Sequence, residues 1–229
     1  MANGSGQVGR NFLAHVATQV WGTFAADMRM NRGYPSALIS EDFVRPAHAN
    51  FTGGYLIQSL GVQPITLANT LARGASLWGE ALSTRLSQYN RLGGVGINGE
   101  CLPSEGNKLT LSAECDVFGV PKARIDFSYG ENEHALNAHA IKVMSNIWRA
   151  AGASDIVSAE RSAHTLGTCR MGTSPDDAVV NADGQSFEVP NLYICDNSTF
   201  PSALAANPAL TTMALALRTA KRFLQKFSA

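Results

Sequence analysis

The chain has 229 residues, of which 45% are hydrophobic and 16% charged, so it is long enough to bury a core in one large domain or parts of two. Its 18 acidic and 18 basic residues balance, which argues against a partner recognised mainly through charge, such as a nucleic acid. No apolar run reaches the roughly 20 residues that a membrane-spanning helix needs. The four cysteines form no C-x-x-C pair, so the sequence predicts no zinc site.

Two glycine patterns, at residues 4–9 and 94–99, fit the G-x-G-x-x-G spacing of a dinucleotide-binding turn. That turn needs a strand before it and an acidic residue about 20 positions later, at the end of a second strand. Only three residues precede the first pattern, and the residues around Asp27 show no strand followed by a turn. The residues before the second pattern do not resemble a strand either. We therefore predict no nucleotide site at either place, and we expect residues 94–99 to form an extended, glycine-rich strand leading into Glu100.

The middle of the chain, residues 29–157, mixes helical and strand patterns. Residues 64–92 carry a leucine stripe typical of helical structure, and residues 131–151 predict a further helix. Residues 108–112 and 123–129 alternate apolar and polar side chains around a turn, which predicts antiparallel strands of a half-buried sheet. Strands followed by a long helix favour an α+β domain.

The last third of the chain contains a short apolar run, a polar loop and an apolar helix. Asn191–Cys195 predicts a strand that ends at Asp196. Asn207 and Pro208 are favoured residues for the start of a helix, and apolar residues recur after them at helical spacing. The N-terminal end of such a helix suits an anion, or a group that becomes negative during a reaction.

The stretch from Ser162 to Arg218 resembles the C-terminal signature of the glucose–methanol–choline (GMC) flavin oxidoreductases. That signature has a His before a Gly-Thr-x-x-Met-Gly loop, then Val-Val-Asp/Asn, Asn-Leu-Tyr-x-x-Asp-x-Ser-x-Phe-Pro, Asn-Pro-x-x-Thr and Ala-Leu-Ala. The corresponding elements here are His164, 167–172, 179–181, 191–201, 207–211 and 214–216. Residues 8–15 are similar to another family segment, with Ala14 where Asp is usual. We interpret His15, at the end of this segment, as structural.

The resemblance implies FAD-dependent oxidation of an alcohol, polyol or sugar CH–OH group, by proton abstraction and hydride transfer to flavin N5. It implies that His164 is the base and that Asn207 holds the alcohol oxygen, roles that suit an imidazole and a second hydrogen-bonding group. The alternatives are a structural histidine and a plain helix cap.

Four further residues are expected to contact FAD: Asp196, Asn197, Pro208 and Ala209. Asp196 resembles the family residue near the ribityl chain or the phosphates. The alternative for Asp196 is a carboxylate that caps a helix or turn. We expect Cys169 and Cys195, inside the motif, to be small buried residues.

The implied fold is α+β: a mostly antiparallel substrate-binding sheet with flanking helices, plus the C-terminal strand and helix of an FAD-binding Rossmann-like domain. Residues 1–28 and 158–229 would belong to the FAD domain and residues 29–157 to the substrate domain. We expect the N-terminal FAD-binding half to be missing, so that the chain alone neither retains FAD nor turns over.

Within the family, the residues at the motif positions resemble those of bacterial polyol and sugar dehydrogenases. An electron-acceptor subunit would then be a further partner. The alternatives are an oxidase that uses oxygen, or an inactive fragment that acts as a binding or assembly module. The sequence leaves the compartment open.

Overall fold

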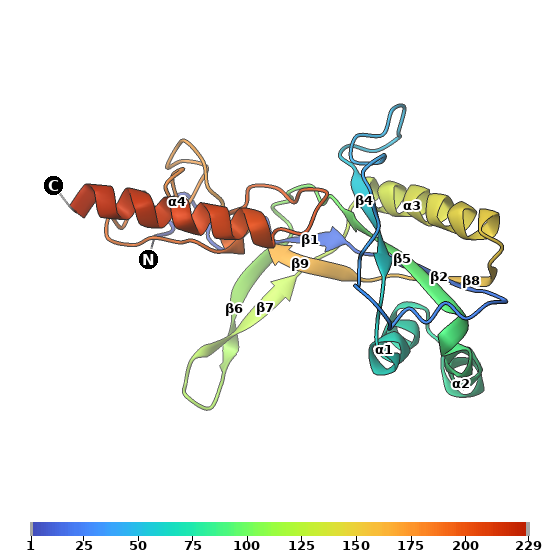
Figure 1. Ribbon diagram of the computed structural model, residues 1–229. Coiled ribbons are helices and arrows are strands. Elements are labelled where there is room, and N and C mark those ends of the chain that lie inside the picture. Colours follow the sequence, from blue (N-terminus) through green and yellow to red (C-terminus); the bar gives the residue numbers. More distant parts are fainter. Residues whose placement is uncertain (1, 228–229) are drawn as a thin grey trace. The chain divides into compact units, whose positions relative to one another are not determined.

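The computed structural model describes residues 2–227, which form two compact units (Figure 1). The first unit combines the residues up to His15 with 101–130 and the residues from His164 onward. The second combines 16–100 with 131–163. Each unit therefore joins segments that are distant in the sequence. A compact unit is not yet a functional domain, so the division into FAD-binding and substrate-binding segments stays a prediction. None of the helices within residues 2–227 has both the length and the apolar composition needed to cross a membrane.

The second unit is built on an antiparallel sheet, as predicted. Its strands, in spatial order, are β3 (Ile39–Ser40), β4 (Tyr55–Leu60), β5 (Leu92–Gly99), β2 (Gln19–Thr23) and β8 (Ser154–Ala159). The strand expected at residues 94–99 is the C-terminal part of β5. Both central strands, β2 and β5, are buried along their whole length, as expected for strands that carry packed elements on both faces.

Helices pack on this sheet through a few large side chains. Leu67 and Leu71 of α1 (Pro64–Gly74) form a buried cluster with Trp21 of β2. Trp148 of α3 (Glu131–Ala150) donates a hydrogen bond from its indole N–H to the carbonyl of Val20. α3 confirms the helix predicted over residues 131–151.

The helical structure predicted over residues 64–92 is confirmed, but it is divided into two α-helices. α1 ends at Gly74, and α2 spans Gly79–Ser87. The backbone N–H groups of Ala75 and Leu77 both bond to the carbonyl of Leu71, and Ser76 takes a positive φ of 53° that reverses the chain. The leucine stripe continues past the break because the leucines on both sides pack against the same cluster.

The first unit contains most of β1 (Leu13–Val16) and β9 (Ser162–Leu166), which are hydrogen-bonded neighbours. It also contains the hairpin of β6 (Lys108–Cys115) and β7 (Pro121–Asp126). The two predicted strands are thus confirmed, but they form a separate two-stranded sheet rather than part of the larger one. The expectation of a half-buried sheet is wrong here, since β6 and β7 are mostly exposed.

The strand predicted at Asn191–Cys195 is also wrong. The segment makes one isolated bridge, between Gln185 and Tyr193, and backbone bonds to Gly184 and Ser186. It is therefore tied to a nearby turn, and an apolar run alone did not distinguish the two arrangements. The C-terminal helix is confirmed: α4 spans Ala209–Phe227, directly after Asn207 and Pro208.

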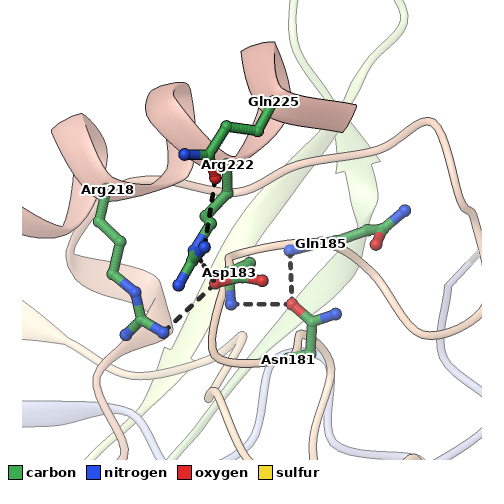
Figure 2. Close-up of polar contacts among 6 residues, drawn as sticks. All are labelled: Asn181, Asp183, Gln185, Arg218, Arg222 and Gln225. Carbon is green, nitrogen blue, oxygen red and sulfur yellow. Dashed lines mark hydrogen bonds and ion pairs between the residues drawn. The ribbon is translucent and has the colours of Figure 1, made fainter. Parts of the chain in front are cut away.

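The middle of α4 lies on the turn at residues 181–185 (Figure 2). The side-chain oxygen of Asn181 accepts the backbone N–H groups of Asp183 and Gln185 and so folds the turn. The carboxylate of Asp183 faces Arg218 at 3.3 Å and Arg222 at 3.6 Å. These partly exposed ion pairs contribute at most about 1 kcal/mol each. Gly184 (φ +75°) follows Asp183 in this turn, and a Cβ there would come within 2.8 Å of the Thr219 hydroxyl of α4. The close approach of the turn to the helix therefore requires a glycine.

Gly94 of β5 gives a direct test of the second unit's core. A Cβ at Gly94 would lie 2.2 Å from the ring of Trp21, which has no exposed surface. We expect Gly94→Ala to lower the free energy of unfolding by roughly 1–3 kcal/mol, as overpacking does. Urea denaturation measures it. The matched control is Gly96→Ala in the same strand, where the nearest atoms are flexible side chains at 3.2–3.3 Å. Equal losses in the two variants would contradict the packing argument.

Candidate functional site

Two histidines meet where β1 pairs with β9. Nδ1 of His15 lies 3.1 Å from Nδ1 of His164. The rings meet edge to face, with their centroids 5.1 Å apart and an interplanar angle of 80°. The residues are 149 positions apart in the sequence, so the contact depends on the pairing of the two strands.

His15 is fully buried, and its other ring nitrogen is also engaged. Nε2 of His15 contacts the backbone carbonyl of Leu204. Burial lowers the pKa of His15 from 6.5 to about 4; the bond to Leu204 opposes this, and the neighbouring His164 adds to it. His15 is therefore neutral near pH 7. The phenolic hydroxyl of Tyr129 donates to the backbone carbonyl of His15 at 2.9 Å and helps to hold the strand in place.

His164 is partly buried and has a left-handed backbone, with φ at +54°. Its Nε2 lies 3.3 Å from the side-chain nitrogen of Asn207. The predicted catalytic pair is thus brought together, 43 positions apart in the sequence, just before the start of α4. The arrangement joins an imidazole, which can accept a proton, to an amide, which can donate a hydrogen bond.

The loop that carries Leu204 and Asn207 is held by the apolar core of the first unit. Phe200 and Ala203 are buried in a cluster with Leu13 of β1, Leu166 of β9 and Cys101. The loop is thereby fixed to the two strands that carry the histidines. The positions of His15, His164 and Asn207 therefore depend on one packed cluster.

A cleft of about 420 Å³ lies next to this site in the first unit. Its walls are Phe12, Leu109, residues 165–168, residues 196–198 and Thr212. Of the residues expected to contact FAD, Asp196 and Asn197 line the cleft, whereas Pro208 and Ala209 are not among its lining residues. Neither His164 nor Asn207 is among them, although Thr165, which follows His164, is.

The side chains of Asp196 and Asn197, which line this cleft, both make hydrogen bonds within the chain. Asp196 accepts the backbone N–H of Ser198 at 2.8 Å, which is the turn-capping role considered as its alternative. The Asn197 side chain accepts the hydroxyl of Thr212 at 2.5 Å and donates to the carbonyl of Thr165 at 3.3 Å. It therefore links the loop to both α4 and β9.

Pro208, Cys169 and Cys195 differ in how deeply they are buried. Pro208 is buried, and its carbonyl accepts the backbone N–H of Thr212 in the first turn of α4. Cys169 is half-buried, and burial raises the pKa of its thiol. The expectation that Cys195 is buried is wrong, because it lies exposed at the end of the irregular segment that replaces the predicted strand.

Within residues 2–227 no three His, Cys, Asp or Glu side chains gather as metal ligands would.

The part of this site that sequence reasoning missed is His15. The sequence indicates a structural role for His15, and the structure adds that its ring contacts the ring of His164. The available signal was the similarity of residues 8–15 to a second family segment, which ends at this histidine.

Comparison with known proteins identifies a family and several relatives. A family model described as GMC oxidoreductase matches residues 103–216. The 2-methyl-1,2-propanediol dehydrogenase of Mycolicibacterium austroafricanum is 32% identical over 244 residues, a match that covers 100% of this chain and 44% of that protein. Paromamine 6'-oxidase of Streptomyces fradiae is 36% identical over 124 residues, covering 52% of this chain and 23% of the relative. The chain therefore spans less than half the length of these relatives.

Solved structures agree on the fold. A formate oxidase variant of Aspergillus oryzae RIB40, whose study concerns FAD modification, superimposes with a TM-score of 0.66 at 13% identity. The superposition covers 97% of this chain and 48% of the formate oxidase chain. Pyridoxine 4-oxidase from Mesorbium loti gives a TM-score of 0.56 at 14% identity, with 96% and 44% covered. The mixed fold with an antiparallel sheet is thus shared with these two oxidases.

The buried, neutral His15 predicts how stability depends on pH. The unfolded chain binds a proton at this side chain near pH 6.5, whereas the folded chain binds it only near pH 4. The contribution of His15 is therefore complete above pH 6.5 and is lost as the pH falls toward 4, by on the order of 3 kcal/mol.

Urea unfolding of the wild type and of His15→Gln at pH 7.5 and pH 4 measures this loss. Glutamine can occupy a similar position without titrating, so the variant should lose clearly less stability between the two pH values. The same loss in both proteins would show that His15 is not responsible.

Proposed function

Because this chain belongs to the GMC oxidoreductase family, we propose that it is the catalytic C-terminal part of an FAD-dependent enzyme that oxidises a CH–OH group to a carbonyl. The substrate class is an alcohol, polyol or sugar. The observation that carries the proposal is the contact between Nε2 of His164 and the amide of Asn207. It places a base and a hydrogen-bond donor side by side.

In the proposed reaction His164 removes the hydroxyl proton at Nε2. The amide N–H of Asn207 turns from Nε2 to the alcohol oxygen and holds it as negative charge develops there. The fixed oxygen orients the carbinol carbon for loss of its hydride. When bound, FAD supplies the acceptor for that hydride.

The residues of the cleft fit part of FAD. Hydroxyl, amide and carboxylate groups of Thr165, Thr168, Asp196, Asn197 and Ser198 line it, and such groups suit a ribityl chain. The first turn of α4, which starts at Ala209, presents N–H groups that lack helical partners and suit an acceptor edge of a ring. We propose that these residues hold the flavin half of the cofactor.

The ADP half of FAD has no matching site in the described residues. Residues 94–99 lie inside β5, and residues 4–9 lead into β1 rather than into a helix, so neither has the strand–turn–helix geometry that binds a pyrophosphate. We propose that a segment beyond this chain holds the ADP half, as the shorter length of the chain relative to its curated relatives suggests.

We propose that the enzyme is a dehydrogenase, which passes its electrons to an acceptor other than oxygen. The relative that matches all of this chain is named a dehydrogenase, and its substrate name is that of a small diol. The relative from Streptomyces fradiae is named an oxidase, so an oxidase is the alternative. Dye reduction without oxygen consumption in the longest product of the gene would favour the dehydrogenase. A purified product without any flavin would favour the other alternative, an inactive binding module.

Removing the base tests the catalytic assignment. In the flavin-loaded enzyme we expect His164→Ala to slow substrate-dependent flavin reduction by roughly 10²- to 10⁴-fold, the usual effect of losing a general base. Asn207→Ala should slow it less, because the base remains. Anaerobic stopped-flow absorbance measures both rates, and circular dichroism checks that the variants are folded. A His164→Ala enzyme with wild-type rates would refute the proposed function.

The cofactor assignment predicts how the isolated chain behaves. Because residues 2–227 contain no pyrophosphate site, this 229-residue chain alone should not retain FAD through gel filtration and should not turn over. The measurement is the absorption spectrum of the protein peak after incubation with FAD. A stoichiometric yellow complex that bleaches when alcohol is added would show that the chain holds the whole cofactor.

A further inference from the structure

We infer that His15 is a positioning residue that fixes which ring nitrogen of His164 carries the hydrogen, so that the Nε2 lone pair faces Asn207. The inference rests on the proposed function for its catalytic consequence. The hydrogen placement itself follows from the contacts of His15, and it can be measured without any turnover.

The carbonyl of Leu204 determines where His15 carries its hydrogen. A backbone carbonyl oxygen can accept a hydrogen bond but cannot donate one. Its contact with Nε2 of His15 therefore requires a hydrogen on that nitrogen. The direction of this bond is fixed by the chemistry of the acceptor.

The second step concerns Nδ1 of His15. A neutral imidazole carries one N–H group, so a hydrogen on Nε2 leaves a lone pair on Nδ1. His15 has no exposed surface, and burial disfavours its charged form. Nδ1 of His15 is therefore an acceptor, and it faces Nδ1 of His164 at 3.1 Å.

The lone pair on Nδ1 of His15 determines which ring nitrogen of His164 carries the hydrogen. Two lone pairs facing each other at this distance would repel, so Nδ1 of His164 carries a hydrogen and donates it to His15. Neutral His164 then has its lone pair on Nε2, which accepts from the amide nitrogen of Asn207 at 3.3 Å. The same nitrogen is the one that the proposed reaction uses as the base.

The arrangement also holds the proton after it has been removed from the substrate. When Nε2 takes the hydroxyl proton, Nδ1–H of His164 still donates to the lone pair of His15. The positive charge stays on His164, because the low pKa of His15 keeps it from binding the proton itself. His15 thus supports the base in both states without touching the reacting atoms.

The test is the protonation pattern of the two rings. Long-range ¹⁵N–¹H NMR of the ¹⁵N-labelled chain at pH 7.5 distinguishes Nδ1–H from Nε2–H in each neutral histidine, and His15 and His164 are assigned with the variants. We expect Nε2–H for His15 and Nδ1–H for His164. A His164 that is mainly Nε2–H in the wild type would overturn the inference.

Two substitutions separate positioning from packing. His15→Phe keeps a buried ring but offers no acceptor, so His164 should shift toward Nε2–H. His15→Gln offers an amide oxygen to His164 and an amide N–H to Leu204, and it should retain Nδ1–H. An unchanged His164 pattern in His15→Phe would overturn the inference. If His15→Phe does not fold, the wild-type and His15→Gln spectra still decide it, since loss of Nδ1–H in either contradicts it.

In the flavin-loaded enzyme, His15→Phe should lower the limiting rate of flavin reduction about tenfold or more, because part of the base is in the wrong form. The substrate concentration for half-maximal rate should change much less, and His15→Gln should restore most of the rate. A wild-type rate in His15→Phe would overturn the positioning role. Failure of the function itself appears separately, as a wild-type rate in His164→Ala while the wild-type chain still shows Nε2–H for His15 and Nδ1–H for His164.

Discussion

The carbonyl oxygen of Leu204 can only accept a hydrogen bond, and that constraint orders the whole candidate site. It sets the hydrogen on His15, which sets the hydrogen on His164, which leaves an accepting nitrogen beside Asn207. The constraint works only if the carbonyl stays in place. The buried cluster around Phe200 and Ala203 provides this, because it packs the loop against the strands that carry both histidines. Apolar packing and proton placement are therefore parts of one arrangement.

The sequence predicted those parts of the fold whose pattern is decided locally. α3 and α4 have helical periodicity, α4 with a clear start at Asn207 and Pro208, and β6 and β7 alternate around a turn. Apolar spacing does not report the path of the backbone, which explains two departures of the structure from the sequence pattern. The leucines of α1 and α2 pack on one cluster although a turn separates the helices. The apolar run at 191–195 pairs with a turn instead of a strand.

The candidate site was predictable where a motif named its residues and not where it depends on strand pairing. His164 and Asn207 were found through the C-terminal motif, and the structure places them in contact. The contact of His15 with His164 could not be inferred from a lone histidine in an apolar segment. It arises because β1 and β9 become neighbours. The roles of Asn197, Pro208 and Ala209 toward FAD stay predictions, since the contacts seen for Asn197 and Pro208 are internal ones.

The left-handed backbone of His164 has a consequence for how this position can change over evolutionary time. A residue with a Cβ in this conformation carries a strain on the order of 1 kcal/mol or more, which glycine would relieve. The backbone conformation by itself thus favours glycine at position 164, whereas the contacts of the imidazole with His15 and Asn207 favour the histidine. In a lineage released from selection for the proposed oxidation, glycine at position 164 would relieve this backbone strain but would leave Nδ1 of the buried His15 without its partner.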